Sequence, residues 1–302
     1  MRGRAILLYV TCCAIWGSTW LVIKIGLADI PPLRFAAWRM AIACFLLTAW
    51  AFRGWRRPTR SELGAMALAG FLQIGVAYAL IFAAERTIAS GLTAVLFSSF
   101  PIWVALFAHF YLPDEPLRAV AVVAGLLGVA GVGILELPAV EAVLEGGRFP
   151  IAALLPLGAA VASAFANVWM KSRLSRVAPP LNLWGQTLVG TIFLAGLSLA
   201  LESGSATRWT ARSIGALAYL SIPGTVVAFL ALFWLIPRVP MASIGAIPLI
   251  DTFVAVTLGA LVLGESVGWR LWLGGAMILT GAALAGRGDR APIARRERIP
   301  AR

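Results

Sequence analysis

Long runs of apolar residues, separated by short polar segments, fill the chain from one end to the other. Each run approaches the roughly 20 residues that an α-helix needs to cross a bilayer. The runs do not alternate polar and apolar positions, as the strands of a membrane β-barrel would, so we expect helices. The pattern predicts ten spans, at about residues 5–26, 33–52, 62–83, 88–110, 117–135, 151–171, 182–201, 213–235, 241–263 and 269–286.

The composition agrees with a membrane environment. Apolar residues make up 61% of the 302 positions and charged residues only 13%, against roughly 45–50% and about 25% in an ordinary soluble domain. The first run follows Arg2 and Arg4, as the core of a secretory signal would. It is longer than such a core, lacks a convincing cleavage site and precedes further spans, so we predict that it is retained.

The formal net charge of +12 would suit a nucleic-acid-binding protein, but its distribution indicates membrane topology instead. If the N-terminus is cytoplasmic, most basic residues fall in the inner segments, including the arginine-rich tail from Arg287 onward. This asymmetry is the positive-inside rule. It predicts that both termini lie in the cytoplasm and that the surrounding partner is the lipid bilayer, with no nucleic acid bound.

The second half of the chain repeats landmarks of the first half, and this period of about 150 residues indicates two copies of one unit. Each copy holds five predicted helices, an odd number, so the second copy must enter the membrane in the opposite orientation. The predicted parts are a first repeat at 1–137, a periplasmic linker at 138–150, a second repeat at 151–286 and a cytoplasmic basic tail at 287–302. The recurring landmarks are Trp20 with Trp169, Lys24 with Arg173, Gly75 with Gly224, Arg86 with Arg238, and Glu115 with Glu265.

Glycine and proline interrupt the third, fourth, eighth and ninth predicted helices. A proline inside a helix removes a backbone hydrogen bond and bends the helix, and in a membrane the freed groups need protein or a wet cavity around them. These four helices are therefore predicted to move and to line a cavity, whereas glycines in the fifth and tenth favour close packing within one chain or in a dimer. The predicted hinge residues are Gly75, Gly91, Pro101, Gly224, Gly245 and Pro248.

Several aromatic residues lie away from the predicted helix ends and have polar neighbours. Aromatic walls with a few placed hydrogen-bonding groups suit an amphipathic organic molecule better than a bare ion. The alternative for each residue is ordinary packing in the core. The predicted substrate-contacting residues are Trp16, Trp20, Tyr78, Phe82, Ser99, Trp103, Asn167, Trp169 and Asp251.

Asp251 is the only acidic residue deep within a predicted span. Charges inside a membrane are costly and usually face a cavity or a partner. Asp251 is therefore expected to carry a coupling proton, to bind a substrate ammonium, or to pair with a basic residue such as Lys24 or Arg39. The charged residues expected at the outer ends of the first four helices either ring the outer mouth or extend to the membrane surface. They are Lys24, Arg34, Arg39, Glu85 and Arg86.

A different class of function is a membrane enzyme that acts on lipid. His109 and Asp114 have the H-x4-D spacing of a lipid acyltransferase motif, but the further blocks of that motif are not visible in the sequence. Cys12, Cys13 and Cys44 have no CxxC spacing, so neither a disulfide framework nor a zinc site is supported. Without an ATP-binding or metal-binding motif, we predict no catalytic residue, no metal site and no cofactor.

The order and spacing of these features resemble the drug/metabolite transporter superfamily, in particular its EamA-type members. The resemblance covers about residues 5–286 and rests on IWGSTWLVIK at 15–24 and on the PDEP and LGES turns after the fourth and ninth predicted helices. It implies a central cavity built mainly by helices 1, 3, 4, 6, 8 and 9, and cytoplasmic termini. The overall likeness is greatest to bacterial aromatic amino acid exporters.

The expected function is therefore secondary-active export of small organic metabolites, chiefly neutral or aromatic amino acids, through a central cavity by alternating access. The expected location is the inner membrane of a bacterial cell, and the expected assembly is a monomer or a homodimer. The alternatives are efflux of cationic drugs and uptake of another metabolite.

Overall fold

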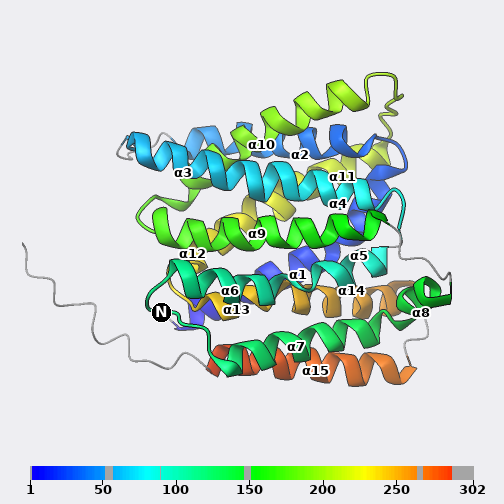
Figure 1. The fold of residues 1–302 in the computed structure, drawn as a ribbon. Helices are drawn as coiled ribbons and strands as arrows, with labels where there is room; N and C mark the ends of the chain where they lie inside the picture. Colours follow the sequence, from blue (N-terminus) through cyan, green and yellow to red (C-terminus); the bar gives the residue numbers. More distant parts are fainter. Residues whose placement is uncertain (1, 52–56, 89, 146–150, 264–267, 288–302) are drawn as a thin grey trace, which may run out of the picture.

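A computed structural model describes residues 2–51, 57–88, 90–145, 151–263 and 268–287. Glu265, residues 146–150 of the predicted linker and residues 288–302 of the predicted tail lie outside this part of the chain. Throughout the described residues the fold is all-helical, and the helices run side by side along one direction (Figure 1). Eight helical stretches there are long and apolar enough to cross a membrane, and a ninth apolar helix is shorter. The prediction of an all-α membrane protein is confirmed.

The first repeat contains five helical columns, two of which are interrupted. The third column changes from α-helix to π-helix and back, and the fourth is broken at Ser98 and Ser99. A short helix, α8, occupies the start of the predicted linker. The elements are α1 (Arg2–Leu27), α2 (Pro32–Ala51), α3 (Arg60–Gly70), η1 (Phe71–Val76), α4 (Ala77–Ala84), α5 (Ser90–Phe97), α6 (Phe100–Tyr111), α7 (Ala119–Leu135) and α8 (Leu137–Glu145).

The second repeat follows the same order with interruptions at the same places. A π-helix again divides the third column, and a break at Ala246 divides the fourth. The elements are η2 (Ile151–Ala153), α9 (Leu154–Arg173), α10 (Pro179–Leu201), α11 (Ala211–Ser221), η3 (Ile222–Val227), α12 (Ala228–Leu235), α13 (Met241–Gly245), α14 (Ile247–Leu263) and α15 (Gly268–Arg287).

Equivalent helices of the two repeats run in opposite directions. The colours of Figure 1 show α1 and α9 leading away from opposite ends of the bundle. The start of α1 and the end of α15 lie at the same end, which we call the proximal end; the other is the distal end (Figure 1). The same local signal begins the third column of each repeat, because Thr59 and Thr210 each cap a helix through a reciprocal capping box.

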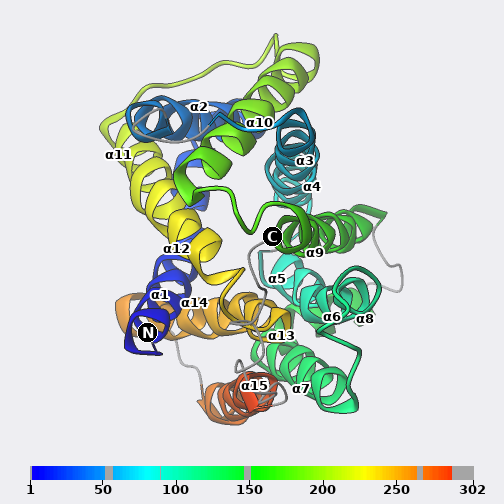
Figure 2. The same cartoon turned by 90° about the vertical axis from the view of Figure 1, so that its left-hand side faces the viewer.

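Two tightly packed helix pairs flank the centre of the bundle. In Figure 2, α2 and α10 lie on one side and α7 and α15 on the opposite side. A Cβ atom built on Gly131 of α7 would lie only 2.7 Å from the carbonyl oxygen of Gly274 of α15. Likewise, a Cβ on Gly281 would lie 2.6 Å from the carbonyl oxygen of Ala124. The predicted small-residue packing of these helices thus forms within one chain, where backbones approach closely in place of side chains.

Five of the six predicted hinge residues lie in a π-helix or within two residues of a break, and Gly91 does not. Gly75 lies in η1 and Gly224 in η3. A π-helix widens the backbone by one residue per turn and leaves part of the normal hydrogen-bonding ladder unfilled. Gly91 lies in α5, Pro101 in the first turn of α6, Gly245 at the end of α13 and Pro248 near the start of α14.

The two broken columns touch each other where they are interrupted. A Cβ atom on Gly245 would lie 3.2 Å from the Cα atom of Pro101 and 3.3 Å from its Cβ atom. A larger residue than glycine at this crossing would push the two repeats apart. The crossing therefore couples an interruption in one repeat to an interruption in the other.

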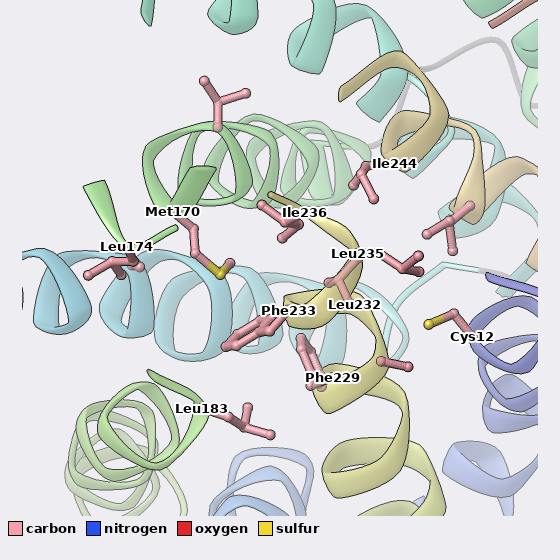
Figure 3. Packing of buried hydrophobic residues seen from close by; sticks show 14 of the residues in the cluster. Cys12, Met170, Leu174, Leu183, Phe229, Leu232, Phe233, Leu235, Ile236 and Ile244 are labelled. Atoms are coloured by element: carbon pink, nitrogen blue, oxygen red, sulfur yellow. The ribbon is translucent and has the colours of Figure 1, made fainter. Parts of the chain in front are cut away.

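A large apolar cluster fills the proximal half of the bundle, and we call it the proximal core (Figure 3). It joins the end of α9, through Met170 and Leu174, to α12, through Phe229 and Phe233. Leu183 of α10 and Cys12 of α1 also belong to this cluster (Figure 3). Because all these side chains are buried, this half of the bundle is closed by packed apolar side chains.

Candidate substrate cavity

A cavity of about 120 Å³ lies between the two repeats. It is lined by α1, by η1 and α4, by the interrupted column of α5 and α6, and by α9, α12, α13 and α14, with one side chain from α2. Five residues of its wall also belong to the proximal core: Phe100, Phe229, Leu232, Ile244 and Ile247. The proximal core is therefore the floor of the cavity.

Seven of the 20 residues that line the cavity are aromatic. Trp16 meets Phe229 edge to face with ring centroids 5.2 Å apart. Tyr78 stacks on Phe82 at 6.0 Å with an angle of 23° between the rings. Such pairs prefer offset or edge-on arrangements and add to the energy of apolar burial. On the interrupted fourth column of the same repeat, Phe97 and Phe100 stack at 5.8 Å. These pairs give the cavity flat apolar faces.

The structure brings six of the nine predicted substrate-contacting residues together around this cavity. They are Trp16, Trp20, Tyr78, Phe82, Asn167 and Asp251.

The other three predicted residues lie outside the cavity wall. Ser99 donates a hydrogen bond to the Leu96 carbonyl at 2.8 Å and accepts one from Trp103 Nε1 at 3.3 Å. These two residues thus satisfy each other beside the break between α5 and α6. Trp169 stacks on Phe165 at 5.9 Å, and the Arg173 guanidinium lies 5.1 Å from its ring centroid. We attribute its position to packing at the proximal end of α9.

Asp251 projects into the cavity from α14 and is only 6% exposed. Trp20 lines the same cavity, and the Thr252 hydroxyl lies 3.5 Å from Oδ1 of Asp251. Within the described part of the chain, no basic side chain lies within 4 Å of this carboxylate, so the suggested pairing with Lys24 or Arg39 does not form. A buried carboxylate without a countercharge is an unusual and costly feature in a membrane protein.

Arg39 is a cavity residue that the sequence did not reveal as one. The sequence groups it with side chains at the outer helix ends, but the structure places it 2% exposed among the residues that line the cavity. Its Nε donates to Thr225 Oγ1 at 2.8 Å and its Nη2 to the Gly224 carbonyl at 3.2 Å. Its position within the apolar segment Phe35–Ala43 was the available signal, because an arginine mid-span has no nearby water to reach.

Two amides form a second polar group in the wall. Asn167 Nδ2 donates to Gln73 Oε1 at 2.9 Å and to the Ser163 carbonyl at 2.8 Å. This fixes the orientation of the Asn167 amide and leaves its Oδ1 buried without a hydrogen-bond partner. A buried acceptor that is left unpaired costs free energy. Oδ1 of Asn167 is therefore suited to receive a hydrogen bond from a ligand.

A charged contact joins both repeats at the proximal end, beyond the core. Lys171 of α9 pairs with Glu115 in the loop after α6, and its Nζ also donates to the Val239 carbonyl. The second carboxylate oxygen of Glu115 accepts a hydrogen bond from the backbone N–H of Met241 at 2.7 Å, at the start of α13. An anion at a helix start is favourable because the first N–H groups have no partner within the helix. This contact, which we call the proximal latch, ties three segments together.

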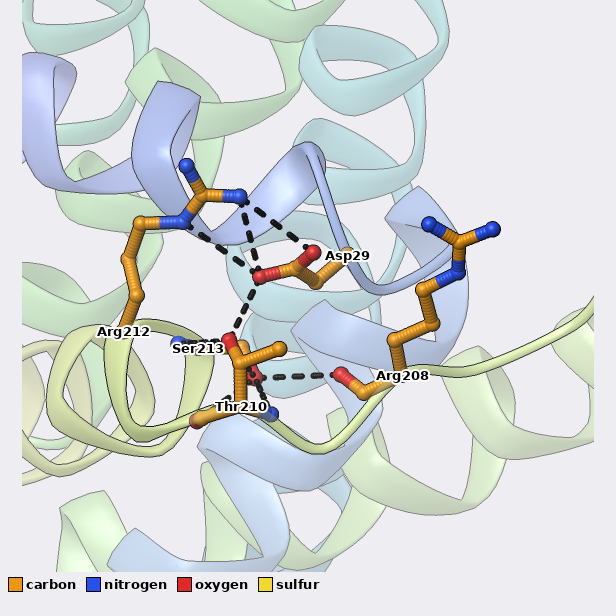
Figure 4. A network of polar contacts seen from close by, with 5 residues as sticks. All are labelled: Asp29, Arg208, Thr210, Arg212 and Ser213. Atoms are coloured by element: carbon orange, nitrogen blue, oxygen red, sulfur yellow. Dashed lines mark hydrogen bonds and ion pairs between the residues drawn. The ribbon is translucent and has the colours of Figure 1, made fainter.

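A second polar network lies at the distal end, where the loop after α1 meets the start of α11 (Figure 4). Asp29 accepts a hydrogen bond from Thr210 Oγ1 at 2.7 Å and pairs with Arg212 at 3.2 Å. The Thr210 hydrogen bond, followed by the hydrogen bond and charge of Arg212, lowers the pKa of Asp29 against an opposing contribution from desolvation. Nearby, burial raises the pKa of Glu85 to about 7, and the positive charge of Lys24 acts in the other direction.

The proposed enzyme residues have a structural contact instead of a cavity position. His109 is exposed at the end of α6, and its Nδ1 accepts a hydrogen bond from the Leu117 backbone N–H at 3.2 Å. This bond closes the turn between α6 and α7. Neither His109 nor Asp114 is part of the cavity wall.

The fold and the cavity define a class of protein: a multi-pass helical membrane protein with two repeats around an aromatic-lined cavity. The chain belongs to the EamA-like transporter family, which it matches over residues 3–137 and 150–287. The family and the relatives below identify a membrane transporter of EamA type.

Two curated relatives span nearly the same length. The chain is 27% identical over 285 residues to the uncharacterized transporter YvbV of Bacillus subtilis (strain 168), covering 94% of this chain and 92% of that protein. It is 28% identical over 269 residues to the uncharacterized inner membrane transporter YedA of Escherichia coli (strain K12), covering 86% and 83%. A solved crystal structure shares the fold with a TM-score of 0.77 at 21% identity, covering 94% of this chain and 97% of the other.

Proposed function

We propose that this chain is a secondary-active carrier that exports small organic metabolites, principally neutral and aromatic amino acids, by alternating access. The observation that carries this proposal is the position of the cavity. Its wall comes from both repeats, and both repeats contribute an interrupted column to it. Inverted repeats around a central site allow one arrangement to open to one face and the mirror arrangement to open to the other.

In this proposal the ten helical columns are ten membrane spans, and the proximal end faces the cytoplasm. The proximal segments hold Lys171, Arg173, Arg176 and Arg238, as the positive-inside rule requires of a cytoplasmic face. The inner membrane of a bacterium is the proposed location, in keeping with the relative that is described as an inner membrane transporter. The structure then represents a state closed to the cytoplasm by the proximal core.

The cavity wall supports an amphipathic organic solute. Its stacked rings offer flat apolar faces, and Asn167, Asp251 and Arg39 place a few polar groups among them. Sites of this composition recognise organic molecules through apolar contact and a small number of oriented hydrogen bonds. An amino acid with an aromatic side chain has both an apolar ring and charged head groups to fit them.

A second candidate function is efflux of cationic drugs. The observation that favours it is Asp251, whose buried carboxylate has no basic partner among the described residues. If cations are the substrates, Asp251→Asn abolishes their transport. Transport that is weakened but retained in Asp251→Asn favours a zwitterionic or neutral solute instead.

Transport by purified protein tests the proposal. Proteoliposomes are loaded with labelled phenylalanine, tyrosine, tryptophan, leucine or a cationic dye, and release is followed with protein-free vesicles as the control. We expect amino acid release from proteoliposomes to exceed release from the protein-free vesicles. It should fall in Trp16→Ala, which removes an aromatic ring from the cavity wall. Release equal to the protein-free control for every amino acid would end the amino acid assignment, and release of the dye alone would favour the second candidate.

A further inference from the structure

We propose that Arg39 is the anchor for an anionic group of the transported solute, and specifically for the carboxylate of an amino acid. This inference rests on the proposed function, because it assigns one subsite within the same cavity. It adds a requirement that aromatic walls alone do not impose: the solute must carry a carboxylate.

Arg39 reaches the cavity from outside the ring of helices that forms the wall. It belongs to α2, which packs on α10 at the edge of the bundle (Figure 2). Its side chain passes between η3, where it bonds to Thr225 and Gly224, and α4, where it lies over Tyr78 with its Cζ 5.1 Å from the ring centroid. A long basic side chain directed inward from a peripheral helix places a positive charge in the cavity wall.

The contacts of Arg39 leave one side of its guanidinium available. Arginine has five N–H donors in a planar fork, and the two hydrogen bonds to η3 occupy one on Nε and one on Nη2. Within the described part of the chain, Nη1 donates to no protein acceptor. The free edge formed by Nη1 and Nη2 matches the two oxygens of a carboxylate, which arginine binds in a bidentate manner.

The charge of Arg39 has no protein anion to neutralise it. Across the described residues, no carboxylate lies within 4 Å of its nitrogens. A buried cation without a counterion is strongly unfavourable, and burial of the pair becomes acceptable only when the partner is close and well oriented. A ligand carboxylate supplies that partner, so binding and neutralisation of Arg39 occur together.

The guanidinium is held in a fixed orientation before any ligand arrives. Thr225 accepts from Arg39 Nε and donates its own hydroxyl to the Leu220 carbonyl at 2.8 Å. The Gly224 carbonyl accepts from both Arg39 and Trp16 Nε1, the latter at 3.1 Å. A side chain already ordered by its neighbours loses little entropy on binding, which favours specific recognition.

The same contacts have a purely structural interpretation, in which Arg39 serves only to satisfy the carbonyl groups of the π-helix. That role needs Nε and Nη2 alone. It explains neither the choice of a permanently charged side chain nor the unused Nη1–Nη2 edge of the guanidinium. The acceptors elsewhere in the wall, Asn167 Oδ1 and the Asp251 carboxylate, are suited to an ammonium group. Together with Arg39 they complement a solute with one negative and one positive head group.

A set of ligands that differ in one group tests this directly. Binding of L-phenylalanine, 3-phenylpropionate and 2-phenylethylamine to the full-length protein in lipid nanodiscs is measured by isothermal titration calorimetry. The first carries both head groups, the second only the carboxylate and the third only the amine. We expect the amine to bind at least tenfold more weakly than L-phenylalanine, because a charge-assisted bidentate contact is lost.

Variants of Arg39 then locate the effect. In Arg39→Gln the preference for L-phenylalanine over the amine is expected to collapse to within about twofold, and in Arg39→Lys, which keeps the charge but not the fork, to fall part of the way. Arg34→Gln is the matched control, because Arg34 lies on the same helix but bonds to Ser205 and Thr207 at the distal end. It should leave the preference unchanged. Size-exclusion chromatography and thermal unfolding check that each variant is folded.

The outcomes separate this inference from the proposed function. If the amine binds as tightly as L-phenylalanine, or if Arg39→Gln keeps the wild-type preference, the carboxylate anchor is wrong while the carrier remains. If 3-phenylpropionate binds but L-phenylalanine does not, the anchor stands and the amino acid assignment falls. If none of the three ligands binds, both are contradicted. Should Arg39→Gln fail to fold, the wild-type ligand comparison and Arg39→Lys still decide the question.

Discussion

The two repeats place a π-helix at the same point of the same column, yet they use it in different ways. In the first repeat, η1 is packed against α10: Ile74 lies over Gly190, and Gly75 lies beside Phe193. In the second repeat, η3 turns its Gly224 carbonyl toward the cavity, where Trp16 and Arg39 both donate to it. One irregular segment is used for helix packing and the other to orient a charged side chain.

This difference shows how a duplicated backbone acquires one specific site. Duplication supplies two matching irregular segments, each of which has carbonyl groups that a regular helix would have used. Side chains then decide what those groups contact. Only the second repeat's segment holds a cation in place, so the cavity has different chemistry on its two sides although its scaffold is repeated.

The first helix of each repeat has a lysine in its last turn, and these two lysines allow the largest expected difference to be measured. Lys171 forms the proximal latch with Glu115, with side chains only 13% and 16% exposed, whereas Lys24 is exposed. Removing one partner of a largely buried ion pair leaves a charge without a countercharge, so Lys171→Met should lower the free energy of unfolding by about 3 kcal/mol. Lys24→Met should change it by less than about 0.5 kcal/mol. Thermal unfolding in detergent, calibrated by denaturant titration, compares the two variants.

An equal loss in both lysine variants would show that the latch adds nothing to the stability of the proximal end. Glu115→Gln provides the check from the other partner and should resemble Lys171→Met.

The packing of the first repeat's irregular column can be probed with two glycines of α3. A Cβ atom on Gly70 would lie 2.6 Å from the backbone Cα of Gln186, whereas one on Gly64 would meet nothing within 4 Å. Gly70→Ala should therefore destabilise the protein by about 1–3 kcal/mol, because backbone atoms cannot move aside as a flexible side chain can. Gly64→Ala should stabilise it by up to about 1 kcal/mol, because alanine favours the helix. If Gly70→Ala is as stable as Gly64→Ala, α3 and α10 do not pack this closely.

The ends of the two π-containing columns differ in their response to pH. The first ends at Glu85 and the second at Ile236, which cannot titrate. Burial raises the pKa of Glu85 from 4.5 to about 7, so the folded state keeps this proton where the unfolded chain has lost it. Stability from this group is fully present below pH 4.5 and is lost as the pH rises from 4.5 to about 7.

Glu85→Gln should therefore flatten the melting temperature between pH 4.5 and 7, and Ile236→Val should not. A wild-type melting temperature that rises across this interval, with the same slope in Glu85→Gln, would contradict the raised pKa.

The smallest effect is expected at the distal network. Arg212 is 59% exposed where it pairs with Asp29, and exposed ion pairs contribute little because water and salt screen them. Arg212→Gln should lower the melting temperature by no more than about 2 °C at neutral pH. The lowered pKa of Asp29 means that its contribution is present above its unfolded pKa of 3.8 and disappears as the pH falls further. A loss in Arg212→Gln as large as that in Lys171→Met would mean that the distal network contributes as much stability as the proximal latch.

The sequence predicted the repeated helical fold and the positions of its interruptions because those features depend on composition and spacing. Apolar runs set the spans, and Gly75, Gly224, Pro101 and Pro248 marked segments that the structure shows to be π-helical or next to a break. These signals are local, so tertiary structure was not needed to recognise them.

The cavity residues were harder to predict because membrane helices are apolar on every face. A helix in water shows its buried face as an apolar stripe, but no such stripe distinguishes a cavity face from a lipid face. Trp103 and Trp169 therefore had the same sequence character as Trp16 and Trp20, and only the last two line the cavity. Arg39 was missed because its hydrogen-bond partners, Thr225 and Gly224, are 186 and 185 positions away in the sequence.

The central claim is that the two repeats move against each other, so that the proximal end closed in this structure opens during transport. The most direct test is the distance between spin labels at Leu117 and Ser175, two exposed positions beside the latch, in a variant whose three cysteines are replaced by alanine. Double electron–electron resonance in nanodiscs should give mainly one short distance without solute and a second, longer population when a transported amino acid is added. A single unchanged distance under both conditions, in protein that still transports, would contradict the claim.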